Sequence, residues 1–159
     1  MSDWIIVAAM IQSLNRPITV SHQFHSLSIL SRAPASDVKA LADLLLPALG
    51  PVEVLQNRTG IVMLPATDSV QGTRFHVGEV LIAEAHVRLT QHAIEGYGAC
   101  IGRDVQHALA IALLDAALHA NQQVEPIQHF VHTQQAALTQ ADAVLMRQVA
   151  ATRVAMETF

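Results

Sequence analysis

Charged residues are scarce in this sequence. Aspartate, glutamate, lysine and arginine together make up 14% of its 159 residues, whereas an ordinary soluble domain has roughly 25%. There is no basic run and no ladder of aromatic residues, and the formal net charge is −4. These absences argue against a nucleic-acid-binding protein, because binding to a phosphate backbone needs clustered lysine and arginine.

Cysteine is nearly absent as well. The single cysteine, Cys100, excludes a disulfide within the chain and any zinc or iron–sulfur site built from its cysteines alone. It lies between Ala99 and Ile101, so we expect an inert thiol in the core. This cysteine usage fits the cytoplasm best.

Hydrophobic residues, in contrast, make up 52% of the chain. With so few charges, a chain of this length covers its own surface poorly. We therefore expect part of that surface to be buried against another chain, and we expect a homo-oligomer when the protein is isolated.

The apolar run at residues 4–11 is too short to span a bilayer, and it lacks the basic start of a signal peptide. We interpret residues 1–21 as an N-terminal extension. Residues 22–159 are long enough for a single α+β domain with a sizeable core, and we expect no contact with a membrane.

Residues 72–89 alternate between apolar and polar side chains, which predicts one long β-strand, or a strand that bends or bulges near Gly78. One parity is apolar and should face a core. The other parity is polar and includes Arg74, His76, Glu84, His86 and Arg88.

The rest of the chain predicts helices at both ends of this strand region. Helical spacing marks residues 22–32 and 36–49, then residues 105–121, with Asp104 as N-cap, and a long helix over residues 127–158. Short strands are expected at residues 52–56 and 61–66, with a turn at residues 57–60 between them, and near residues 96–101. The predicted fold is therefore α+β, with about four mostly antiparallel strands, N-terminal helices and two C-terminal helices.

Common catalytic motifs are missing. Gly96-Tyr97-Gly98 does not continue into a dinucleotide-binding loop, because position 101 is isoleucine, and the sequence has neither a P-loop nor a G-x-S-x-G nucleophile elbow. Histidine and glutamate can bind zinc, but His76 and His86 stand about 33 Å apart along one strand, so only a fold-back or neighbouring strand could unite them. We assign no metal, cofactor or catalytic residue.

A series of short motifs occurs in a recognisable order. They are Arg74-Phe75 with Gly78, Val87-Arg88-Leu89, Gly96-Tyr97, Gly102-Arg103-Asp104, His107-Ala108, Leu113-Leu114-Asp115-Ala116 and Thr152-Arg153-Val154. Together they resemble the G subunit of the carbon–phosphorus lyase core complex over residues 24–159.

This resemblance implies membership of a bacterial assembly that makes phosphonates usable as a phosphorus source. The companion partners are the I, H, J and L subunits. In the associated reaction, a phosphonate displaces adenine from the ribose C1′ of ATP and gives ribose 1-phosphonate 5-triphosphate. A separate radical subunit later breaks the carbon–phosphorus bond. The resemblance supplies no catalytic residue for this chain.

Five side chains remain as possible phosphate or partner contacts: Arg74, His76, His86, Arg88 and Arg103. Arg103 stands beside a predicted helix N-terminus, where a phosphate could bind, or where the arginine could form an ion pair. Asp115 lies in the buried helix, and we expect it to pair with Arg88, Arg103 or an arginine of a partner chain.

Two functions are compatible with these features. The favoured one is an accessory subunit of the lyase complex that is not catalytic alone. The alternative is a stand-alone small-molecule-binding protein or enzyme that uses the polar face of the long strand.

Overall fold

The computed structural model describes residues 19–152, so the extension expected at residues 1–21 lies almost entirely outside the described residues. Within the described range the chain forms four helices and a three-stranded antiparallel sheet, which confirms the α+β class. In chain order the elements are α2 (Thr19–Arg32), α3 (Ala35–Leu49), β1 (Val52–Thr67), β2 (Arg74–Leu89), β3 (Ile94–Ile101), α4 (Val105–His119) and α5 (Val124–Ala151).

The described residues form three strands where about four were expected, because β1 is one strand of 16 residues. Residues 57–60, read as a turn, instead pair with residues 82–85 of β2. Asparagine and glycine favour turns in isolation, but pairing with a long neighbouring strand overrides that local preference.

The single long strand expected over residues 72–89 is confirmed as β2, and so is the bulge near Gly78. The β1–β2 register passes from Leu64 opposite Gly78 to Pro65 opposite His76, which leaves Val77 without a partner. An extra residue of this kind reverses the alternation of side chains beyond it.

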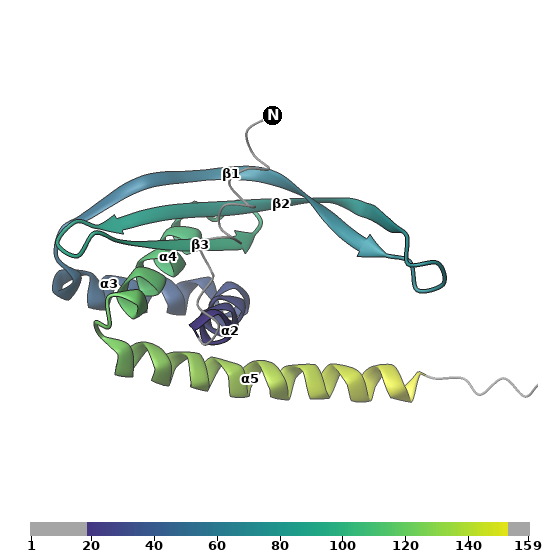
Figure 1. Cartoon of the computed structure of the whole chain (residues 1–159). Helices are drawn as coiled ribbons and strands as arrows, with labels where there is room; N and C mark the ends of the chain where they lie inside the picture. The colour runs from purple at the N-terminus through teal and green to yellow at the C-terminus, as the bar shows by residue number, and fades with distance from the viewer. Residues whose placement is uncertain (1–18, 153–159) are drawn as a thin grey trace, which may run out of the picture.

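All four helices lie on one side of the sheet (Figure 1). We call the opposite side the outer face. Helix α4 packs directly against β2 and β3, and its side chains are buried nearly all round. The expected N-cap is confirmed, because the carboxylate of Asp104 accepts a hydrogen bond from the backbone N–H of His107 at 2.9 Å.

Glycines in β3 allow α4 to approach closely. A Cβ on Gly96 would overlap the backbone of Ala112, and a Cβ on Gly98 would overlap the backbone of Ala108 and Ala112. The sheet and this helix therefore meet with almost no side-chain spacer between them.

The β1–β2 hairpin continues well past the end of β3 and past α2, α3 and α4 (Figure 1). We call this projection the arm and define it as residues 61–67 of β1 and 74–81 of β2. At the bottom of the same view, α5 also extends beyond the body. Its apolar side chains Leu145, Met146 and Val149 are exposed.

We expect Gly98→Ala to lower the free energy of unfolding by about 3 kcal/mol, because the new methyl group must displace the α4 backbone. Gly60→Ala is the matched control, since no atom lies within 4 Å of a Cβ at that position. Urea denaturation followed by circular dichroism measures both changes. Equal stability of the two variants would contradict the close packing described here.

Candidate functional site

The outer face of the sheet carries polar side chains from all three strands. Residues paired directly across an antiparallel sheet project to the same face, so Glu53, Arg88 and Glu95 share it. Glu84 and His86 alternate with Arg88 along β2 and share the same face, with Arg58 opposite Glu84. Within residues 19–152, no helix or further strand covers this face. We call this set of residues, with Tyr97, the polar row.

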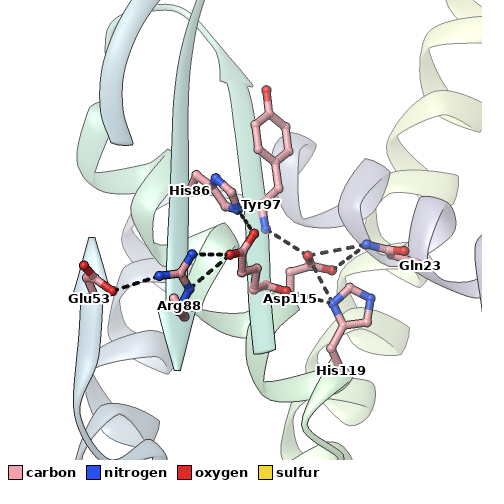
Figure 2. Close-up of polar contacts among 8 residues, drawn as sticks. Gln23, Glu53, His86, Arg88, Tyr97, Asp115 and His119 are labelled. Atoms are coloured by element: carbon pink, nitrogen blue, oxygen red, sulfur yellow. Dashed lines mark hydrogen bonds and ion pairs between the residues drawn. The ribbon is translucent and has the colours of Figure 1, made fainter. Parts of the chain in front are cut away.

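Arg88 occupies the centre of one half of the polar row (Figure 2). Its guanidinium donates to Glu95 at 3.0 Å and 2.6 Å and to Glu53 at 3.3 Å. The other oxygen of Glu95 lies 2.9 Å from Nε2 of His86. One carboxylate on β3 therefore holds two basic groups of β2.

Glu84 occupies the centre of the other half. Its carboxylate accepts from Nε of Arg58 at 2.6 Å and from the hydroxyl of Tyr97 at 2.9 Å. The three residues belong to β2, β1 and β3 respectively, so this contact also spans the whole sheet.

These contacts shift the proton affinities of the row. The hydrogen bonds from Arg88 hold the pKa of Glu95 below its usual value, and the same contact raises the pKa of Arg88. Burial, with the hydrogen bond to Glu84, raises the pKa of Tyr97. These pKa shifts keep Arg88 protonated, Glu95 ionised and Tyr97 neutral. None of these three groups is therefore poised to exchange a proton near neutral pH.

Asp115 of α4 lies beneath the sheet and is only 2% exposed. Its carboxylate accepts from the backbone N–H of Tyr97 at 2.9 Å and from Nε2 of Gln23 at 3.2 Å, and Nδ1 of His119 lies 3.7 Å away (Figure 2). The expected arginine partner, Arg88 or Arg103, is wrong, because Arg88 lies on the outer face and Arg103 makes no such contact. Burial raises the pKa of Asp115.

The structure separates the five candidate contact residues. His86 and Arg88 belong to the polar row. Arg74 and His76 lie beyond the bulge at Val77, where they pair with Thr67 and Pro65 on the helix-side face of the arm. No fold-back brings His76 to His86.

Arg103 is exposed in the turn between β3 and α4. The carboxylate of Asp104 already occupies the first turn of α4 and also accepts from Lys39 at 2.7 Å. A phosphate at this helix end would therefore meet a carboxylate that is already bound to its N–H groups. In residues 19–152, no three histidine, cysteine or acidic side chains gather as metal ligands.

The sequence reasoning missed Glu95, Tyr97 and Gln23. A hairpin that turns at residues 90–93 places Glu95 opposite Arg88 and Tyr97 opposite His86, so its register could have identified the first two. No local signal links Gln23 to Asp115, which is 92 positions away.

Cys100 is buried as expected, and burial raises the pKa of its thiol.

The structure also shows an open hollow on α5, lined by His132, Gln135, Ala136, Thr139, Gln140 and Ala143. All its lining residues belong to that helix, so it is not a part of the polar row.

The family described as phosphonate metabolism protein PhnG matches residues 23–159. This chain belongs to the PhnG family. A PhnG protein has a role in phosphonate metabolism according to that description, and the matched region includes the sheet, the arm, α4 and α5. No helix of this PhnG protein within residues 19–152 is long and apolar enough to cross a membrane.

The buried carboxylate of Asp115 predicts a pH dependence. Its pKa is higher in the folded than in the unfolded chain, so the folded state takes up the proton first as the pH falls. This residue therefore contributes more to stability as the pH falls toward the ordinary carboxyl pKa of about 4, and that contribution is lost as the pH rises through its raised folded-state pKa.

The measurement is the free energy of unfolding in urea for the wild type and for Asp115→Asn at several pH values. We expect the wild type to gain stability relative to the variant toward acid. Taking the difference cancels Glu95 and Asp104, whose lowered pKa values act in the opposite direction. A difference that is flat, or that grows toward neutral pH, would contradict the assignment.

Proposed function

We propose that this chain is an accessory subunit of the carbon–phosphorus lyase complex. In that complex it supports the displacement of adenine from ATP by a phosphonate, which gives ribose 1-phosphonate 5-triphosphate. The observation that carries the proposal is the PhnG family match over residues 23–159. The proposed partners are the I, H, J and L subunits.

The apolar exterior supports a role within an assembly. On the arm, Ile61 is 65% exposed, Val77 is 66% exposed and Phe75 is 49% exposed. The exposed apolar side chains at the end of α5 add a second patch. Monomeric proteins seldom expose several large apolar side chains together, because contact of apolar surface with water is unfavourable relative to burial.

The polar row supports a structural rather than a chemical role for the outer face. Glu84 and Glu95 are each held by at least one basic group, and Arg88 lies between two carboxylates. A general acid or base needs a free position for its proton near the substrate. The row instead joins the three strands to each other.

We expect this chain to co-elute with the companion subunits after co-expression, as a complex of defined stoichiometry in size-exclusion chromatography with mass measurement. Burial of its exposed apolar side chains supplies the driving force. A companion preparation without this chain is the control for the mass assignment. A chain that always elutes apart from its companions would overturn the proposal.

A further inference from the structure

The arm is a two-stranded ribbon with no cover from the described residues. Strand β3 ends before it, and although α5 extends below it in the view of Figure 1, residues 61–65 and 74–79 of the arm are all exposed. Two-stranded ribbons are marginally stable in water unless a third strand or a packed face supports them. The arm instead exposes apolar side chains on both of its faces.

One edge of the arm is open for strand pairing. Strand β3 ends at Ile101 opposite Ile82, and the last contact on this side is the N–H of Gly102 donating to the carbonyl of Leu81 at 2.9 Å. Because alternate residues of a strand point their N–H and C=O groups to the same side, those of Glu79 face the open edge. Among the described residues no strand pairs with residues 74–80 there.

This edge has little protection against pairing. Natural edge strands carry proline, charged side chains, bulges or covering elements that discourage addition of another strand, and of these the bulge at Val77 and a few charged side chains occur here. The opposite edge of the arm, on β1, includes Pro65, whereas residues 74–81 contain neither proline nor lysine. At the end of β3, Ile101 is 82% exposed, in line with the position that an added strand would occupy.

Two arginines stand at the ends of the open edge. Arg74 begins β2 at the distal end, and Arg103 follows the end of β3 at the proximal end. Both side chains are exposed, and neither has a hydrogen-bond or ion-pair partner within residues 19–152. A complementary segment would therefore be apolar in its middle and carry carboxylates near its two ends.

We propose that an extended segment of a companion subunit adds to the sheet along residues 74–81, with acidic side chains meeting Arg74 and Arg103. The segment pairs with the β2 backbone between Gly78 and Leu81, continues past the bulge and buries Ile101 and Phe75. This mode of recognition is β-strand addition, in which the backbone supplies affinity and the side chains supply specificity. The inference rests on the proposed function, which provides the companion.

A second copy of this chain fits the same edge less well. Antiparallel self-pairing of residues 74–81 would bring Arg103 of each copy beside Arg74 of the other, so like charges would meet at both ends. Residues 1–18 of the same chain fit less well for a different reason. The family match includes the whole arm but begins at residue 23, so such an occupant would lie outside the family's shared region.

Hydrogen–deuterium exchange with mass spectrometry, on the isolated chain and on the co-purified complex, tests the proposal. Within residues 78–81, the amide of Glu79 faces the open edge. We expect this amide to exchange freely in the isolated chain and to be protected in the complex. We also expect the double variant Arg74→Glu, Arg103→Glu to bind the companions about tenfold more weakly or worse. The double variant Arg74→Lys, Arg103→Lys keeps both charges and is the matched control, with binding near that of the wild type.

Each other result overturns the proposal in a distinct way. A complex in which the Glu79 amide exchanges as in the isolated chain, with full binding by the glutamate variant, would refute strand addition but leave the proposed function standing. Protection already present in the isolated chain would assign the edge to residues 1–18 or, if the mass is doubled, to a second copy. A wild-type chain that fails to assemble would refute the proposed function, and this inference with it. Equal urea midpoints of the three proteins show that the substitutions leave the fold intact.

Discussion

The close packing of α4 against β2 and β3 is the constraint on which the rest of the structure depends. Gly96 and Gly98 bring the helix backbone so near the sheet that only small side chains, mainly alanine, fit between them. This approach buries Asp115 directly under β3, where it accepts the N–H of Tyr97. A buried carboxylate is costly unless its hydrogen bonds are made, so the helix position and the backbone of β3 fix each other.

The same packing leaves the two faces of the sheet with different tasks. The helix-side face forms the core, and the outer face carries the polar row, whose contacts cross all three strands. Exposed ion pairs of this kind add little stability individually, but charge pairs opposite each other disfavour a slipped register. Beyond the end of β3, neither the core on one face nor the polar row on the other continues. The arm extends from the body there, and among residues 19–152 no third strand pairs with it on either side.

Much of this arrangement follows from the sequence, and the failures have physical causes. The alternation of residues 81–89 identifies β2, because burial on one face leaves a period of two. Helix α4 is buried nearly all round and has no such period, and its length and its N-cap Asp104 identify it instead. The split of β1 at Asn57 was wrong, since strand pairing overrides local turn preference. The polar face was only partly right, because the pattern located the bulge near Gly78 without showing that Arg74 and His76 change sides. The partners of Asp115 depend on contacts between distant elements, which no periodicity encodes.

We propose that this chain contributes to phosphonate chemistry only as a part of a larger assembly. Phosphorus NMR with ATP and an alkyl phosphonate, comparing this chain alone, the companion subunits alone and the complete mixture, tests that claim most directly. We expect ribose 1-phosphonate 5-triphosphate in the complete mixture, much less without this chain, and none from this chain alone. Formation of that product by the isolated chain, or at an undiminished rate by the companions without it, would contradict the account.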